Sequence, residues 1–187
     1  MIPTIATVTL GGDIKKKLKA ISKAGFHSIE LFDTDLDRFE GSSKELNNLI
    51  KDFGLSLASY FPLRNFEGMP EEKKESVFNE AKYYLDTAKE LGSEMVMICS
   101  NTNQESLPNE IKITSDLNEL AEIAKNFELK LAYEPLAWGT HVNSYRHAMQ
   151  LINDADHENL GIALDAFHIL SKQDDINQIR HIPRDKI

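Results

Sequence analysis

Two apolar runs of the chain end in a carboxylate and lie about thirty residues apart in the sequence. They are 129–134 (LKLAYE), which ends at Glu134, and 160–165 (LGIALD), which ends at Asp165. If the two runs are neighbouring parallel strands, their ends lie roughly 4.8 Å apart, so both carboxylates could bind one divalent cation. A carboxylate that ends a strand also commonly caps the next helix or faces solvent. For each residue taken alone, that alternative stays open.

A histidine follows the second carboxylate at a spacing that suits proton chemistry. His168 lies three positions after Asp165, so we expect it beside the cation. Imidazole titrates near neutral pH and can move a proton to or from a substrate, while a neighbouring metal stabilises negative charge. The alternative role for His168 is to cap or pack at the start of the next helix.

The elements that must position these side chains are predicted from the hydrophobic pattern. Short apolar runs predict strands near 4–9, 27–33, 56–61, 94–99, 129–134 and 160–165. Segments with apolar residues at helical spacing lie between them, at 14–21, 46–53, 77–91 and 117–124. Gly25, Gly54 and Gly92 end three of these segments, where a left-handed C-cap is favourable. This alternation of strand and helix predicts a parallel sheet.

Two parallel architectures suit strands of this kind, an open doubly wound sheet and a (β/α)₈ barrel. The first usually carries a glycine-rich phosphate loop, and no G-x-G-x-x-G or P-loop motif follows any predicted strand. The second gathers polar side chains at the C-terminal ends of its strands. This chain carries such groups at Glu30, Arg64, Asn101, Glu134 and Asp165. We therefore predict an α/β fold of the (β/α)₈ TIM-barrel type.

The length of the sequence predicts only part of such a barrel. TIM barrels typically need about 250 residues, whereas this sequence has 187. We expect residues 1–187 to form a single partial TIM-barrel domain of about six βα units, with strands 7 and 8 outside the sequence. An open barrel leaves strands 1 and 6 unpaired on one side. We expect a partner chain, a swapped segment or disorder at these two edges.

The composition argues against several classes of partner. It is 41% hydrophobic and 27% charged, as in an ordinary globular domain. A formal net charge of -9 without a basic footprint argues against nucleic acid. No run approaches the roughly 20 apolar residues of a membrane span, and the N-terminus lacks the pattern of a signal peptide. These features predict a cytoplasmic protein with no membrane partner, in which the one cysteine, Cys99, is buried in a strand.

Five strand and loop pieces carry a resemblance to a known family. They are, in chain order, LFDTDLDRFEGS, FPLRNFEGMP, CSN, YEPLAWGTHVNSYRHA and LDAFHIL. In this order and spacing they closely resemble bacterial 3-dehydroshikimate dehydratases of the xylose-isomerase-like TIM-barrel superfamily. The resemblance covers essentially all of the chain. In some members of that family the barrel is fused to a C-terminal domain similar to 4-hydroxyphenylpyruvate dioxygenase.

The resemblance implies a metal-dependent lyase. The cation is usually Mg²⁺ or Mn²⁺, with Co²⁺ or Zn²⁺ as alternatives, and one side chain from each of strands 5 to 8 holds it. Glu134 and Asp165 match the first two ligands, and the other two would lie beyond Ile187, so these residues alone are expected to hold a hydrated metal weakly. The implied reaction removes water from 3-dehydroshikimate to give protocatechuate, through an enolate that the cation stabilises.

The same chemistry assigns roles to further residues. His168 is the candidate for proton transfer with the substrate. Arg64 is the cation expected to bind the substrate carboxylate, with an ordinary surface arginine as the alternative. We expect Glu30 at the barrel mouth as a hydrogen-bond partner, Asn101 in contact with substrate or capping its loop, and His141 in the pocket lining.

Two other interpretations stay open. The same barrel and the same two acids would serve a sugar isomerase or epimerase, because fold alone does not separate these reactions. The FPLRNFEGMP and CSN loops favour the dehydratase, since they resemble that family. The second alternative is a non-catalytic interaction fragment whose unpaired strand edges bind a partner. Both enzyme hypotheses imply a small-molecule substrate, and a homo-oligomer is compatible with either.

Overall fold

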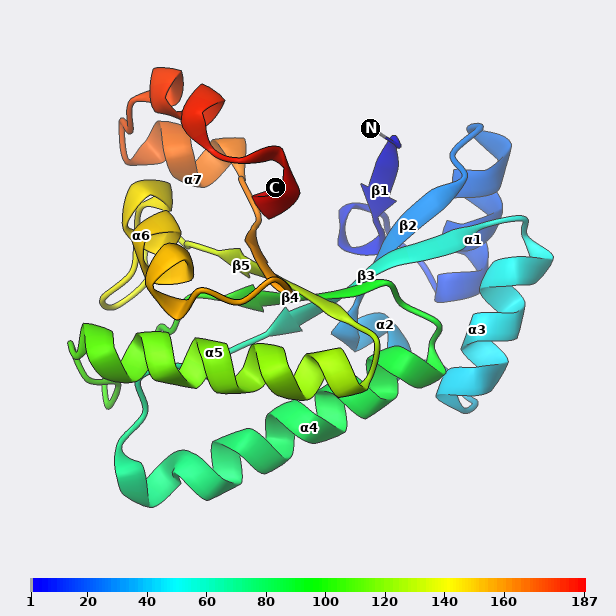
Figure 1. Ribbon diagram of the computed structural model, residues 1–187. Coiled ribbons are helices and arrows are strands. Elements are labelled where there is room, and N and C mark those ends of the chain that lie inside the picture. The colour runs from blue at the N-terminus through cyan, green and yellow to red at the C-terminus, as the bar shows by residue number, and fades with distance from the viewer. Residues whose placement is uncertain (1) are drawn as a thin grey trace.

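Six parallel strands form one sheet in the computed structural model, which describes residues 2–187 (Figure 1). The strands are neighbours in chain order: β1 (Thr4–Ala6), β2 (Ser28–Phe32), β3 (Ser56–Leu63), β4 (Met95–Cys99), β5 (Lys130–Glu134) and β6 (Leu160–Ile162). Every pair is parallel. This order and direction are those of a TIM barrel, as predicted, and they bring the C-terminal ends of all six strands to the same side.

Helices connect successive strands and follow one another around the sheet (Figure 1). They are α1 (Ile14–Lys23), α2 (Asp33–Asp37), α3 (Ser43–Asp52), α4 (Lys74–Glu90), α5 (Glu110–Asn126), α6 (Tyr145–Ala155) and α7 (Ala166–Ser171). Short 3₁₀ turns lie at Thr7–Thr9, Glu71–Lys73, Ile176–His181 and Arg184–Lys186. None of the helices within residues 2–187 is long and apolar enough to cross a membrane.

Local sequence signals set where the helices begin and end. Ser42 and Glu45 form a reciprocal capping box at the start of α3, and Asp13 caps α1 through the backbone N–H of Lys16. The three glycines predicted at helix ends all have positive φ, as a left-handed C-cap requires. The predicted helix ends are therefore confirmed at these positions.

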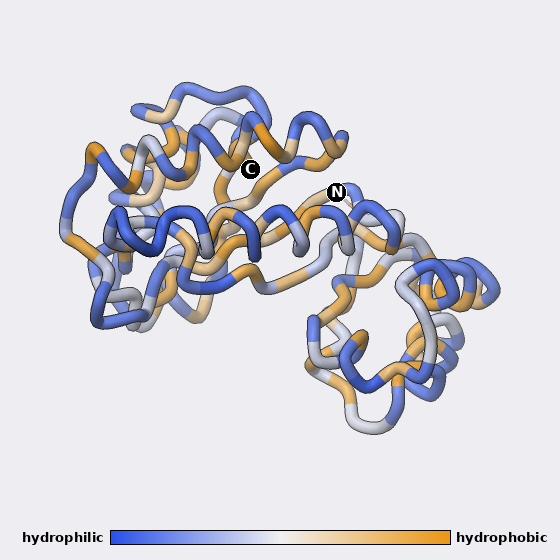
Figure 2. Tube along the Cα trace, turned by 90° about the horizontal axis from the view of Figure 1, so that it is seen from below, coloured by the Kyte–Doolittle hydropathy of each residue, from blue (hydrophilic) through white to orange (hydrophobic). Residues whose placement is uncertain are grey.

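The core lies between the sheet and the helices. Its largest fully buried side chains include Leu18 of α1, Ile29 of β2, Leu85 of α4 and Tyr133 of β5. In Figure 2 the strands are mostly hydrophobic, whereas the helices alternate between hydrophilic and hydrophobic residues. This is the pattern of a parallel sheet buried beneath amphipathic helices.

The two outer strands are shorter than predicted. The first ends at Ala6, because Thr7–Thr9 turns into a 3₁₀ helix in which the Thr9 hydroxyl donates to the Ala6 carbonyl. The last ends at Ile162. Asp165 therefore does not end a strand: its side chain accepts from the N–H of Phe167 and caps α7. The helix cap that the sequence left open for this acid is therefore observed, through Oδ1, and its role as a metal ligand stays a prediction.

The chain itself partly covers one edge of the sheet. The Lys186 ammonium group donates to the carbonyls of His157 (2.9 Å) and Leu160 (3.2 Å), at the start of β6. This contact places the 3₁₀ turn at Arg184–Lys186 against the outer edge of β6. A partner, a swapped segment or disorder was expected at this edge. The Leu160 carbonyl at this edge is therefore bonded within residues 2–187, and the expectation of a partner, a swapped segment or disorder at the two edges stays a prediction.

Candidate active site

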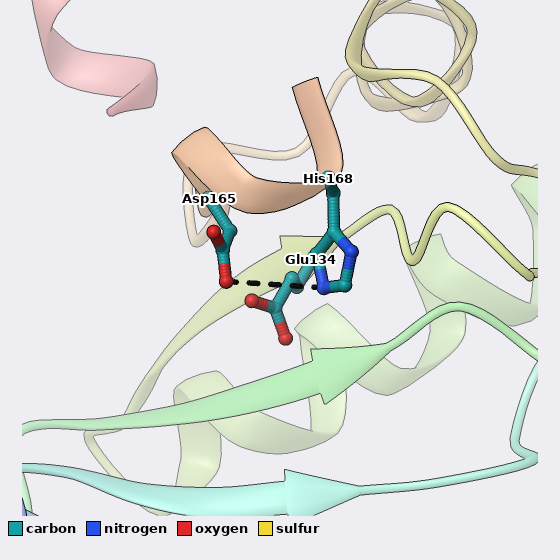
Figure 3. A group of neighbouring side chains, drawn as sticks. All are labelled: Glu134, Asp165 and His168. Carbon is teal, nitrogen blue, oxygen red and sulfur yellow. Dashed lines mark ion pairs between the residues drawn. The ribbon is translucent and has the colours of Figure 1, made fainter. Parts of the chain in front are cut away.

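Glu134, Asp165 and His168 converge at the C-terminal side of the sheet (Figure 3). Glu134 is the last residue of β5, Asp165 caps α7, and His168 lies in the first turn of that helix. One potential ligand atom from each of the three lies within 4.8 Å of the others. The Asp165 Oδ2 atom is 3.8 Å from His168 Nε2. The convergence predicted from the sequence is confirmed; its use as a metal site stays a prediction.

The Glu134 carboxylate is nearly buried, with 9% of the residue exposed. Burial raises the pKa of Glu134, and the nearby Asp165 and Glu30 carboxylates add to the rise, whereas a hydrogen bond from Cys99 and the nearby His168 oppose it. The Cys99 thiol donates to Glu134 Oε2 across 3.2 Å. Carboxylates crowded in a partly dry site repel each other. A bound divalent cation would remove that repulsion, and oxygen donors suit a hard cation, so the residues present fit a metal.

His168 is buried, and three neighbours hold its ring. Its Nδ1 atom accepts a hydrogen bond from the backbone N–H of Ala137 across 3.3 Å. The rings of Trp138 and Phe167 meet it edge to face, with centroids 4.9 and 5.3 Å away. The ring is therefore held with Nε2 facing the two carboxylates, as Figure 3 shows.

The three residues open into a pocket of about 800 Å³. Its other lining residues include Glu30, Cys99 and Trp138 together with apolar side chains, among them Phe32, Phe61, Met97, Leu136 and Leu164. No lysine or arginine within residues 2–187 lines it. A slightly larger hollow, about 910 Å³, lies beside α1 and α3 and contains none of the three residues. The first pocket is therefore the candidate active site, because it contains Glu134, Asp165 and His168.

A family model described as the xylose isomerase-like TIM barrel matches residues 18–187. The chain belongs to this family. It is 40% identical over 184 residues to a 3-dehydroshikimate dehydratase of Pseudomonas putida, a match that covers 98% of this chain and 29% of that protein. Residues 1–187 thus span less than a third of the length of this curated relative.

Solved structures of xylose isomerase-like TIM barrels agree with this fold. A xylose isomerase-like TIM barrel/4-hydroxyphenylpyruvate dioxygenase fusion protein superposes with a TM-score of 0.96 at 40% identity, covering 98% of this chain and 30% of that one. A structure of the IOLI protein with a bound zinc atom superposes with a TM-score of 0.88 at 22% identity, covering all of this chain and 70% of that one. The second match shows the fold alone.

Of the four residues predicted to bind substrate, the structure places only Glu30 in the pocket of this barrel. Glu30 lies on β2 and accepts from the Ser59 hydroxyl across 3.3 Å. Burial raises the pKa of Glu30, and this hydrogen bond opposes the rise. Glu30 therefore adds a third carboxylate to the rim of the cluster.

The other three predicted residues do not line the pocket and are in contact with other protein groups. Arg64 forms an ion pair with Asp33 and lies over the Phe32 ring. Both ends of the Asn101 side-chain amide are bonded within the protein, as Nδ2 donates to the Glu67 carbonyl and Oδ1 accepts from the N–H of Asn103.

The imidazole of His141 lies 2.8 Å from the carbonyl of Ser106, within hydrogen-bond distance. The contacts of Asn101 and His141 tie the loops after β3, β4 and β5 together. Contact of Arg64, Asn101 and His141 with substrate stays a prediction.

Sequence reasoning missed the carboxyl group of Glu67, which is buried on the β3–α4 loop. Its Oε1 atom accepts from the N–H of Asn101 (2.6 Å) and from the Tyr133 hydroxyl (2.8 Å), and its Oε2 atom has no partner within residues 2–187. Burial raises the pKa of Glu67 to about 7. No spacing rule marks an acid in a loop as buried, so the sequence carries no local signal for it.

Proposed function

We propose that this chain forms part of a metal-dependent 3-dehydroshikimate dehydratase, a lyase that removes water from its substrate to give protocatechuate. The observation that carries the proposal is the cluster of Glu134, Asp165 and His168 in a pocket at the C-terminal side of the sheet. The 40% identity to a dehydratase across nearly the whole chain selects this reaction from those that the fold supports.

Glu134 and Asp165 would hold the metal, for which we propose Mg²⁺ or Mn²⁺, with Co²⁺ or Zn²⁺ as alternatives. Hard divalent cations prefer carboxylate oxygens and keep several waters when few side chains bind them. When bound, the cation supplies stabilisation of the negative charge that develops on a substrate oxygen. The raised pKa of Glu134 implies that protons compete with the metal, so affinity falls as the pH is lowered.

The protein groups then bind the substrate and move its protons. His168 presents Nε2 to the pocket, where it exchanges a proton or a hydrogen bond with the substrate. Arg64 is proposed to bind the substrate carboxylate, which requires its guanidinium group to exchange Asp33 for substrate. Asn101 and His141 are proposed to shape the rim of the site through the loops they join.

The test is a turnover assay with the full-length gene product and, in parallel, with residues 1–187. Each is stripped of metal, given Mg²⁺, Mn²⁺, Co²⁺ or Zn²⁺, and mixed with 3-dehydroshikimate, while the aromatic product is followed by its ultraviolet absorbance. We expect metal-dependent formation of protocatechuate by the full-length protein. Glu134→Gln should abolish it, whereas Asp154→Asn, which changes an exposed acid of α6, should not.

Other outcomes of the assay would select the alternatives. Isomerisation of a keto sugar without dehydration of 3-dehydroshikimate would favour a sugar isomerase or epimerase on the same two acids. No turnover and no metal binding in either form would leave a non-catalytic interaction fragment. Calorimetric titration of residues 1–187 with Mn²⁺ separates loss of the metal site from loss of substrate binding.

The proposal includes a cytoplasmic enzyme that acts on a small molecule, without a nucleic-acid or membrane partner. The net charge of -9 and the buried, unpaired Cys99 support it. Assembly into a homo-oligomer is also part of the proposal. Light scattering of the purified protein tests it directly.

A further inference from the structure

A tight turn at residues 136–139 carries the backbone group that contacts His168. The N–H of Gly139 donates to the carbonyl of Leu136 across 2.8 Å, which makes Ala137 and Trp138 the two central residues of a β-turn. The N–H of Leu136 in turn donates to the Ser100 hydroxyl across 2.9 Å, just after β4. The turn is therefore fixed at both ends.

The packing around Gly139 leaves this turn little freedom. A Cβ atom at Gly139 would lie 2.1 Å from the carbonyl oxygen of Val142 and 2.5 Å from the hydroxyl oxygen of Ser100. Only glycine permits so close an approach of two backbone segments. The direction of the Ala137 N–H is thus set by the fold, independently of any substrate.

The N–H of Ala137 points at one nitrogen of the His168 ring. Because Nδ1 accepts this hydrogen bond, it carries no proton, and the proton of the neutral ring lies on Nε2. This tautomer is assigned from the hydrogen bond. Nε2 is the nitrogen that faces Asp165 and Glu134 in Figure 3. His168 therefore presents an Nε2–H donor to the pocket.

This arrangement is the reverse of that around a metal-binding histidine. A ligating histidine usually donates its second ring N–H to a carboxylate or a carbonyl, which leaves the other nitrogen free to bind the metal. At His168 the other ring nitrogen, Nδ1, accepts a hydrogen bond from the N–H of Ala137. Nε2 therefore keeps its own proton. One potential ligand atom of His168 lies within 4.8 Å of those of the two acids, yet Nε2 carries a proton that it can donate in a hydrogen bond.

We infer that the Leu136–Gly139 turn fixes His168 as the Nε2–H tautomer, so that His168 serves the site as a hydrogen-bond donor and not as a metal ligand. In the proposed dehydration, on which this role rests, the donor would face a substrate oxygen that gains negative charge. Ala137 and Gly139 are positioning residues. The Trp138 ring, 4.9 Å away at 76°, limits rotation of the imidazole.

The test is the tautomer of His168, measured by two-dimensional ¹H–¹⁵N NMR on the ¹⁵N-labelled protein near pH 8. The signals are assigned by their loss in His168→Gln. Ala137→Pro removes the N–H while keeping the turn, because proline suits the second position of a β-turn. Ala137→Ser keeps the N–H and is the matched control.

In the unmodified protein we expect a protonated Nε2 and a pyridine-type Nδ1. Loss of one neutral hydrogen bond should shift the tautomer ratio toward Nδ1–H by about 2- to 10-fold in Ala137→Pro, and Ala137→Ser should show no shift. A protonated Nδ1 in the unmodified protein would overturn the inference, as would an unchanged ratio in Ala137→Pro.

Addition of Zn²⁺ separates this inference from the proposed function. If His168 is a donor, Nε2 keeps its proton while Zn²⁺ binds the two carboxylates. If Nε2 loses its proton on titration with Zn²⁺, His168 is a ligand, and the inference fails while the metal site stands. Neither result depends on turnover of 3-dehydroshikimate.

Discussion

The side chains at the candidate site divide into groups that would hold a cation and a group that would act on the substrate. Glu134 and Asp165 supply oxygen ligands, whereas His168 presents a nitrogen whose partner is fixed by the backbone of Ala137. The two functions are therefore separable by mutation. A change at His168 should affect the reaction far more than it affects metal binding.

We expect His168→Ala in the full-length protein to lower kcat by about 10²- to 10⁴-fold, the usual contribution of a positioned acid, base or donor. The affinity for Mn²⁺, measured by calorimetric titration, should stay within a few-fold of the unmodified value. Helix α7 should survive, because its cap is Asp165 and not His168. Turnover at the unmodified rate would return His168 to a packing role.

Glu67 gives the stability of the protein a pH dependence. Its pKa rises from 4.5 to about 7 on folding because the carboxyl group is buried, and Asp116 adds to the rise. Hydrogen bonds from the N–H of Asn101 and the hydroxyl of Tyr133 oppose it. A folded-state pKa above the unfolded one means that the stabilisation is complete below about pH 4.5 and is lost as the pH rises through 7. Protonation of Glu67 thus stabilises the folded state.

We expect Glu67→Gln to remove this pH dependence. The shift in pKa corresponds to about 3 kcal/mol, so the free energy of unfolding of the unmodified protein should fall by up to that amount between pH 4.5 and 8 because of Glu67. Urea unfolding at both pH values measures the difference. Glu72→Gln, at an exposed position of the same connection, is the control. Equal pH slopes for the unmodified protein and Glu67→Gln would contradict the assignment.

The elements of the barrel were predictable where the sequence carries local signals, and less so where partners lie far along the chain. Ser42 with Glu45, and glycines at helix ends, act within a few residues, so the helix limits follow from the sequence. The run LGIALD stays apolar up to Leu164, but the strand ends at Ile162 because Asp165 caps the next helix. The apolar pattern alone does not show which of two overlapping local signals, the strand or the helix cap, ends the strand.

Some residues of the candidate site could likewise be predicted from the sequence, and others could not. Glu134 and Asp165 stand out because acids that follow consecutive apolar runs must meet at one edge of a parallel sheet. The contacts of Arg64 with Asp33 and of Asn101 with Glu67 join residues more than thirty positions apart or on different loops. No periodicity encodes such pairs, so these side chains could be placed only by the structure.

Helix α3 offers a test of a local signal at the scale of one element. Ser42→Ala removes the side chain that accepts from the N–H of Glu45, and we expect a loss of about 1 kcal/mol in the free energy of unfolding. Ser43→Ala, one position later and without a cap contact, is the matched control. Thermal unfolding of the two variants measures the difference. An equal effect of both would show that the cap contributes little.

At the scale of the whole molecule, the sheet has two outer strands in different surroundings. β1 and β6 each pair with one neighbour in the part of the chain that the structure describes. At β6 the Lys186 ammonium group binds two carbonyls at the start of the strand. Unpaired strand edges invite pairing with other chains, and the Lys186 contact covers one carbonyl of the β6 edge.

Hydrogen exchange of the backbone amides should report this asymmetry. Lys186→Ala removes two hydrogen bonds from a charged donor at a partly exposed position. We expect the two together to contribute about 1.4 kcal/mol, so the amides of Leu160–Ile162 should exchange about tenfold faster. Those of β1 should not change, because Lys186 contacts only the β6 side. Lys172→Ala, at an exposed position after α7, is the control. If exchange rises equally at both edges, the variant loosens the whole sheet. In that case Lys186 stabilises the fold at large and does not protect one strand.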